Sequence, residues 1–348
     1  MKTNALRILF VIAGVAGLIL AANAQETTGQ HLPIIDMHLH AHTLSMYGTP
    51  PPAVCTNDQE IVFPGWDPRE PLRLEGTGNQ AMSCPLRLKA PATDDQLLLQ
   101  TIHLLERYNI RAVTSGPLDE VTKWHHSASD RIIPAVPFDD YEKRDPEAFR
   151  QLFKEGKFAV FAEISSQYHG LSPADGSLEP YFALAEELDI PVGIHMGEGP
   201  PGAAYLWSSK YRARLTSPFL LEEVLVRHPR LRVYAMHYGS PLVDEMLAML
   251  FSHPQLYVDV SGNDWMLPRK EFHSHLRRLV EAGFGKRIMF GSDEMVWPQT
   301  IKVAIESIES AEFLNEEQRR DIFCRNAARF LRLDLTSCNS QLENKPRL

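Results

Sequence analysis

Short apolar runs alternate with amphipathic segments along most of the chain. From residue 92 onward, stretches with apolar residues at helical spacing, such as DDQLLLQTIHLLERYN, are each followed by a short continuous apolar run. Such runs are typical of parallel strands buried on both faces, and the preceding stretches are typical of helices that cover them. With one early run included, the pattern predicts eight strands within PIIDMHLH, IRAVTSGP, RIIPAVPF, KFAVFAEIS, IPVGIHMGEG, LRVYAMHYG, QLYVDVSG and KRIMFGSDE.

This alternation predicts the fold class. Eight strands that alternate with helices, apart from a long first connection, predict an α/β protein with a (β/α)8 TIM barrel. A doubly wound open sheet is the alternative, but no G-x-x-x-x-G-K-[ST] phosphate loop favours it. The first connection, residues 43–91, is rich in proline and glycine and is expected to be an irregular loop insertion with a functional role.

The first 24 residues have the pattern of a signal peptide. Lys2 and Arg7 precede the apolar run at residues 8–22, and Ala22-Asn23-Ala24 has the small-x-small form of a cleavage site. A membrane anchor is the alternative, but the run is short for a span of about 20 residues and a polar stretch follows it. The sequence therefore predicts an exported chain, periplasmic or secreted, with residues 25–348 forming a single barrel domain.

Charge limits the partners that we expect. Removal of Lys2 and Arg7 with the leader changes the net charge by two, from −9 to −11. A field of this sign repels polyanions, and no basic stripe with interleaved aromatic residues offsets it. We therefore expect a small-molecule substrate, no nucleic-acid partner and no membrane span after processing, while the oligomeric state stays open.

Export would allow disulfides to form among the four cysteines. Three pairings are compatible with four cysteines. Cys55 and Cys84 lie in the same irregular segment, and this pairing is favoured. A bond between Cys324 and Cys338 is left open, because Cys324 could also be an inert residue on a helix face.

Metal-ligand side chains cluster where the predicted strands end. His38 and His40 are two residues apart, so in a strand both would face the same way and could bind one cation. Each such residue alone has a structural explanation, such as a hydrogen-bonded core histidine or an aspartate that caps a turn. Together they predict a metal site, because barrel enzymes place their sites at the carboxyl ends of the strands. The candidates from five strands are His38, His40, Glu163, His195, His237 and Asp293.

From about residue 32 to residue 333 the chain resembles the amidohydrolase superfamily, and more closely its amidohydrolase-related branch of metal-dependent TIM-barrel hydrolases. The resemblance rests on IIDMHLH, GIHMGEG, AMHYGSP, LYVDVSG, MFGSDE and CRNAARFLRL. The pattern of H-x-H, two later histidines and an aspartate on the eighth strand is specific. Glu163 occupies the place of the strand-4 ligand, where the superfamily has a carboxylated lysine, a glutamate or no ligand.

The resemblance implies roles for these residues. His38, His40, His195 and Asp293 would bind one Zn²⁺, and His237 would bind a second ion or polarise the substrate. Glu163 would bridge two ions, whereas a pairing of Glu163 with an arginine would indicate a mononuclear site. Zinc lowers the pKa of bound water to about 7, and Asp293 could take that proton and pass it to the leaving group.

The predicted activity is hydrolysis of a small ester, lactone, amide or related bond. The alternative is a decarboxylase or hydratase of a small carboxylic acid, with a mononuclear site and the strand-6 histidine as acid and base. A non-catalytic metal-binding barrel is disfavoured, because a structural zinc site is closed by four protein ligands. Residues that bind substrate stay unknown, and the aromatic or charged candidates in loops after strands are Trp66, Trp124, Tyr168, His169, Glu198, Tyr205, Trp207, Arg212, Arg214, Trp265 and Trp297.

Overall fold

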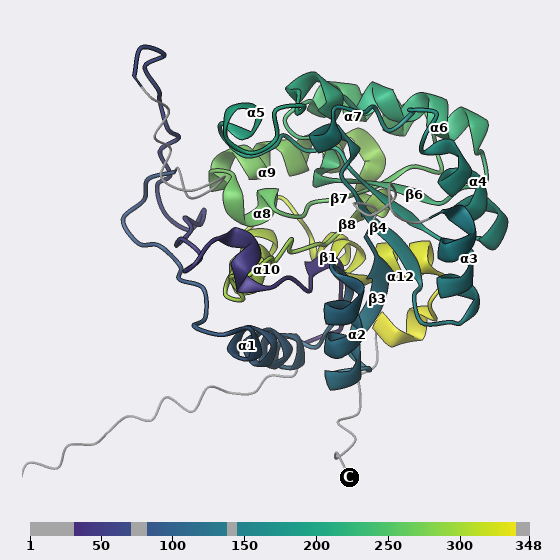
Figure 1. The fold of residues 1–348 in the computed structure, drawn as a ribbon, viewed down its shortest axis with the longest axis horizontal. Helices are drawn as coiled ribbons and strands as arrows, with labels where there is room; N and C mark the ends of the chain where they lie inside the picture. The colour runs from purple at the N-terminus through teal and green to yellow at the C-terminus, as the bar shows by residue number, and fades with distance from the viewer. Residues whose placement is uncertain (1–30, 71–81, 138–144, 339–348) are drawn as a thin grey trace, which may run out of the picture. The chain divides into compact units, whose positions relative to one another are not determined.

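The computed structural model describes residues 31–70, 82–137 and 145–338, so the predicted signal peptide lies outside the described part. Eight parallel strands form one sheet in the order in which they occur along the chain, with helices between them (Figure 1). This arrangement confirms the predicted TIM barrel. The strands are β1 (Ile34–His40), β2 (Ile110–Ser115), β3 (Ile132–Val136), β4 (Val160–Ile164), β5 (Val192–His195), β6 (Val233–Met236), β7 (Tyr257–Asp259) and β8 (Ile288–Met289).

The segment after the short strand β8 closes the barrel against β1. Met37 N donates to the carbonyl oxygen of Phe290 at 2.9 Å, and His40 N donates to that of Glu294 at 2.9 Å. Between these two bonds, Asp293 N donates to the carbonyl oxygen of His38 at 2.7 Å. Closure of the barrel therefore places the last predicted ligand next to the first.

The helices follow from local signals in the sequence. The Thr93 side chain accepts a hydrogen bond from Gln96 N at the start of α1, and Asp145 accepts one from Ala148 N at the start of α3, as N-caps do. In the part of the chain that is described, no helix is both long and apolar enough to span a membrane. The helices are α1 (Asp94–Arg107), α2 (Leu118–Ser127), α3 (Pro146–Lys154), α4 (Glu179–Leu188), α5 (Ala203–Leu206), α6 (Glu222–Arg227), α7 (Val243–Ser252), α8 (Asn263–Met266), α9 (Arg269–Leu279), α10 (Thr300–Glu309), α11 (Glu316–Arg320) and α12 (Asn326–Leu331).

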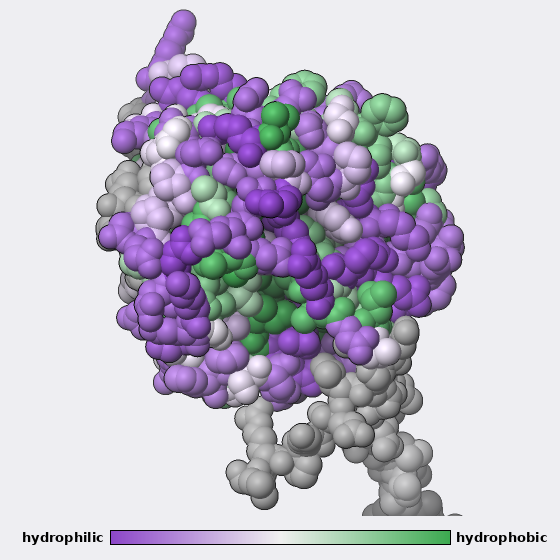
Figure 2. Space-filling view, turned by 90° about the vertical axis from the view of Figure 1, so that its right-hand side faces the viewer, coloured by the Kyte–Doolittle hydropathy of each residue, from purple (hydrophilic) through white to green (hydrophobic). Residues whose placement is uncertain are grey.

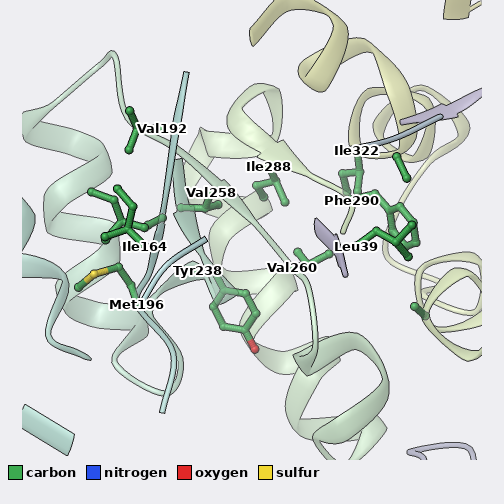
Figure 3. Close-up of a cluster of buried hydrophobic side chains, with 14 of the residues drawn as sticks. Leu39, Ile164, Val192, Met196, Tyr238, Val258, Val260, Ile288, Phe290 and Ile322 are labelled. Carbon is green, nitrogen blue, oxygen red and sulfur yellow. The ribbon is translucent and has the colours of Figure 1, made fainter. Parts of the chain in front are cut away.

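Buried apolar side chains fill both sides of the strands. Outward-facing residues such as Leu39, Val258 and Phe290 pack in one cluster with the surrounding helices (Figure 3). A second cluster, which includes Met37 and Tyr234, fills the barrel interior and continues onto the apolar face of α12. The outer surface in Figure 2 is mostly hydrophilic, with hydrophobic side chains in smaller patches. The interior of the barrel is thus packed with side chains.

The first connection is more ordered than predicted where it is described. A 3₁₀ turn (Leu44–Tyr47) follows β1, and two antiparallel bridges join Val54 to Leu88 and Val62 to Ser83. The disulfide between Cys55 and Cys84 links the same two branches, which confirms the predicted pairing. Cys324 and Cys338 form a second disulfide, so the open alternative of an inert Cys324 is wrong.

Candidate metal centre

All six predicted ligands meet at the carboxyl end of the barrel. His38 and His40 end β1, Glu163 lies in β4, His195 ends β5, and His237 directly follows β6. The Nε2 atoms of His38 and His40 are 3.0 Å apart, and His237 Nε2 is 3.2 Å from His195 Nδ1. The ring nitrogens within each pair are therefore close together, and the two pairs are His38 with His40 and His195 with His237.

The carboxylate of Glu163 lies between the two histidine pairs. Its Oε2 atom is 3.6 Å from His38 Nε2 and 3.7 Å from His40 Nε2. Its Oε1 atom contacts His195 Nδ1 and lies 3.7 Å from His237 Nε2. One carboxylate therefore presents a different oxygen to each pair, and among the described residues its ion-pair partners are these histidines rather than an arginine or lysine.

Asp293 lies beside the first histidine pair, His38 and His40. Its Oδ1 atom lies 3.1 Å from His40 Nε2 and 3.4 Å from His38 Nε2. Asp293 and His237 have positive φ angles of 49° and 59°, in the left-handed region that non-glycine residues seldom adopt. Backbone conformations of this kind concentrate at functional sites, where the surrounding structure holds them in place.

Gly262 allows the chain after β7 to approach the centre closely. Its φ angle is +69°, and a Cβ atom at this position would lie 2.8 Å from Asp293 Oδ2 and 3.4 Å from His237 Nδ1. A larger residue would therefore be strained by its φ angle and would force Asp293 Oδ2, and Met266 Cε at 2.5 Å, to shift. Glycine is needed here for steric reasons.

Hydrogen bonds below the centre fix the tautomers of two histidines. His237 Nδ1 lies 2.9 Å from the carbonyl oxygen of Ser261, which can only accept, so Nδ1 carries the proton. The Ser261 hydroxyl donates to Asp259 Oδ1 at 2.7 Å and accepts from His38 Nδ1 at 2.8 Å. In their neutral forms both imidazoles therefore direct an Nε2 lone pair at the centre, as metal-binding histidines do.

Electrostatics at the centre favour bound positive charge. Burial acts to raise the pKa of Glu163, but the imidazoles of His195 and His38 outweigh it and hold this pKa well below its ordinary value. Burial also acts to raise the pKa of Asp293, yet His38 and His40 lower it. Burial lowers the pKa of His237, but Glu163 and Asp293 outweigh it and raise this pKa to about 10. Both carboxylates are thus ionised and attract either protons on the imidazoles or a metal ion.

The donor set fits a divalent metal ion. Three groups of possible ligand residues overlap, because His38, Glu163 and His237 each belong to two of them. Within each group the ligand atoms all lie within 4.8 Å of one another. The Nε2 atom of His195 is buried without a hydrogen-bond partner among the described residues, although its Nδ1 atom faces Glu163. Imidazole nitrogens and carboxylate oxygens converging on one buried point suit zinc and related ions. The three groups are His38 with His237 and Asp259, His38 with His40 and Glu163, and Glu163 with His195 and His237.

A cavity of about 450 Å³ opens above the centre, and some of the substrate-binding candidates from the sequence line it. Trp207, Trp297, Tyr168 and Glu198 line it, as expected for residues in loops after strands. Other candidates lie elsewhere: Trp124 is buried on α2, Trp265 is buried with its indole N–H donating to Ser292 O, and His169, Tyr205, Arg212 and Arg214 do not line the cavity. Of the five tryptophan candidates, Trp207 and Trp297 therefore line the cavity, and Trp66, Trp124 and Trp265 do not.

Three residues at the site do not emerge from the sequence pattern. Asp259 ends β7 on the same rim as the ligands, and its Oδ1 atom also accepts from His237 N at 2.8 Å. Ser261 follows two residues later. His42 stacks on His40 with ring centroids 4.3 Å apart and lines the cavity. Attention to the polar residues at the end of the seventh strand would have indicated Asp259.

Comparison with known proteins agrees with this geometry. The family model described as amidohydrolase matches residues 35–333. No curated protein sequence matches the chain significantly. A probable 2-pyrone-4,6-dicarboxylic acid hydrolase from Acinetobacter baumannii, solved with citric acid bound, is similar in structure, with 14% identity, a TM-score of 0.55, and coverage of 87% of this chain and 100% of that chain.

Two further solved structures are similar to the same extent. A 2,6-dihydroxybenzoate decarboxylase from Rhizobium has 16% identity and a TM-score of 0.53, with coverage of 87% of this chain and 99% of that chain. An uncharacterized TIM-barrel protein from Bordetella bronchiseptica has 17% identity and a TM-score of 0.54, with coverage of 73% and 88%. At these identities the likeness concerns the fold.

Proposed function

Because the chain belongs to the amidohydrolase family, we propose that it is a metal-dependent hydrolase that cleaves a small ester, lactone, amide or related bond. The observation that carries the proposal is the position of Glu163, with one carboxylate oxygen toward each histidine pair. Two cations held about 3.5–4 Å apart need an anionic group between them, and paired metal sites of this kind serve hydrolytic enzymes.

The proposed ligands are the six residues predicted from the sequence. His38, His40 and Asp293 would hold the first ion. His195 lies with His237 on the other oxygen of Glu163, so these two histidines would hold a second ion, or His237 would polarise the substrate. Glu163 would bridge the two ions. We propose Zn²⁺ as the metal, which when bound lowers the pKa of water to about 7 and polarises a carbonyl group.

Asp293 and His237 would do the remaining chemistry. Asp293 lines the cavity, and its Oδ1 atom is held against His40, so its carboxylate can take a proton from the attacking water. The same group can then pass the proton to the leaving atom of the substrate. His237 also lines the cavity, and its Nδ1–H bond to Ser261 O keeps the ring orientation fixed during this transfer.

A second candidate is a metal-dependent decarboxylase or hydratase of a small carboxylic acid, with one metal ion. The family match does not separate the two activities, and a decarboxylase shares the fold as closely as a hydrolase does. In this alternative Glu163 would pair with His195 as it does in the structure, and His237 would act as acid and base.

We also propose that the protein is exported after removal of residues 1–24. The two disulfides support this, because such bonds persist in oxidising compartments. Residues 25–348 would then be the mature chain.

Metal analysis followed by an activity screen tests the proposed function. The purified protein, before and after chelation and zinc reconstitution, is assayed against esters, lactones, amides and aromatic carboxylic acids. We expect metal-dependent hydrolysis, and Asp293→Asn should reduce turnover by about 1,000-fold or more while metal-free unfolding stays cooperative. Asp293→Asn activity within about tenfold of wild type, a barrier change of about 1.4 kcal/mol, would reject the role of Asp293. Decarboxylation without hydrolysis would favour the second candidate.

A further inference from the structure

None of the described residues that line the cavity is an arginine or a lysine. Beyond the lining histidines and the metal-centre carboxylates Glu163 and Asp293, the charged side chain among these described residues is that of Glu198. Arg212, from the loop after β5, instead donates to the carbonyl oxygens of Ser209 and Tyr211. A carboxylate on a substrate, away from the metal centre, would therefore lose its hydration without gaining a partner.

Aromatic side chains form the wall of the cavity beside His195. The ring of Tyr168 lies 5.3 Å from that of His195 and 5.1 Å from that of Trp207, measured between centroids. Tyr47 and Trp297, which also line the cavity, pack edge to face with their centroids 5.3 Å apart. Rings held against one another in this way make a rigid apolar surface that costs little ordering when a ligand binds.

Four exposed aromatic residues lie in the loops after β1 and β5, and we define them as the aromatic collar: Phe63, Trp66, Tyr205 and Trp207. Phe63 and Trp207 line the cavity, yet they are 47% and 48% exposed. Trp66 and Tyr205 are 42% and 74% exposed, and their ring centroids are 5.7 Å apart, which joins the loop after β1 to the loop after β5. Exposed aromatic side chains that are grouped at a cavity mouth indicate a binding surface.

We propose that the site takes neutral esters or lactones whose part remote from the scissile bond is an aromatic or similarly bulky apolar group. This group lies along Trp207 and the aromatic collar, and a carboxylate on it is rejected. The identity of the reacting bond, an ester or lactone, rests on the proposed hydrolytic function, but the recognition of the remote group does not. Recognition of the remote group follows from the aromatic residues that line the cavity and from the absence of an arginine or lysine among the described lining residues.

Two sets of matched compounds test this recognition. The first set is 2-naphthyl acetate, its 6-carboxylated derivative and methyl acetate, assayed with the zinc-loaded full chain. We expect kcat/KM for the neutral naphthyl ester to exceed that of the carboxylated ester by about 100-fold. Trp207→Ala should lower the ratio of kcat/KM between naphthyl and methyl acetate by about tenfold. Phe251→Ala, which removes an aromatic ring that is 82% exposed on α7, should leave this ratio unchanged.

The second set measures binding without reaction. Calorimetry compares 2-naphthol with 6-hydroxy-2-naphthoate on the metal-free and the zinc-loaded protein, and 2-naphthol should bind about tenfold more tightly, or better, to both. Equal or tighter binding of the carboxylate, or no binding of either compound, would overturn the inference. Hydrolysis that is faster for the carboxylated ester would also overturn it and leave hydrolysis standing. Preferential 2-naphthol binding with no ester hydrolysed would support the recognition and reject the proposed function.

Discussion

The Nδ1 atom of His38 lies 2.8 Å from the hydroxyl of Ser261, although the two residues are 223 positions apart in the sequence. Because the same hydroxyl donates to Asp259, it accepts the proton of Nδ1 and keeps the Nε2 lone pair of His38 directed at the centre. Partners of this kind orient a metal ligand and raise its basicity.

Ser261→Ala should therefore weaken metal binding while the ligands themselves remain. We expect a loss of about 10- to 100-fold in zinc affinity, measured by competition with a chromophoric chelator. Ser307→Ala is the matched control, because Ser307 is also buried but bonds to Asn57 and touches no proposed ligand. Affinity of Ser261→Ala equal to that of the control would show that Ser261 does not position His38.

Much of this site can be predicted because the hydrophobic pattern shows where each strand ends in the sequence. Once eight buried runs are identified, their carboxyl ends must share one rim, so the sequence alone brings His38, Glu163 and Asp293 together. The direction in which a residue after a strand points is not encoded in this way. Trp124 follows a strand as Trp207 does, yet helical spacing turns Trp124 into the core and leaves Trp207 at the cavity.

Hydrogen-bond partners are harder to predict than ligands. Ser261 is a residue type common in any loop, and its role depends on an approach of β1 to the end of β7 that no local pattern indicates. The second disulfide is equally hard to predict, because helical spacing leaves open whether Cys324 faces the core or Cys338.

The disulfide between Cys55 and Cys84 should stabilise the cavity wall as well as the fold. It closes a loop of 29 residues, which corresponds to about 3–4 kcal/mol in the chain-entropy model. Met82, close in sequence to Cys84, lines the cavity, so we expect the Cys55→Ser/Cys84→Ser variant to lose both stability and substrate affinity. Urea unfolding and KM values measure the two effects.

The second disulfide provides the control. Cys324→Ser/Cys338→Ser opens a loop of 14 residues and should cost about 3 kcal/mol, yet neither residue lines the cavity. KM should stay unchanged in this variant. An equal rise in KM for both double variants would mean that the first disulfide contributes only general stability.

Asp264 should make the stability of the metal-free protein depend on pH. It is fully buried, and neither carboxylate oxygen has a hydrogen-bond partner among the described residues. Burial, together with Asp36, raises the pKa of Asp264 well above the ordinary 3.8. Above pH 3.8 the unfolded chain releases this proton while the folded chain keeps it, so stability falls as pH rises.

Asp264→Asn removes this penalty, because the amide has no proton to release and resembles the protonated acid. The free energy of unfolding of the variant, relative to wild type, should therefore increase from about pH 4 to about pH 7. Asp119→Asn, at an exposed position on α2, should show no such increase. Urea unfolding at several pH values measures the difference, and a constant difference would show that Asp264 is ionised in the folded protein.

Glu163 should determine how many metal ions the protein binds. Its Oε2 atom faces His38 and His40, and its Oε1 atom faces His195 and His237. Replacement by glutamine keeps the size of the side chain and removes the charge that two neighbouring cations require. We expect elemental analysis to find two ions per wild-type chain and one in Glu163→Gln.

Turnover of Glu163→Gln should fall by orders of magnitude, because one of the two ions that would act on the water and the carbonyl is lost. Glu198→Gln is the matched control, since Glu198 also lines the cavity but accepts a hydrogen bond from Ser240 and, among the described residues, forms no ion pair with a histidine. It should keep both ions. A wild-type protein that binds one ion, together with full activity of Glu163→Gln, would contradict the bridging role and move the mononuclear decarboxylase to first place.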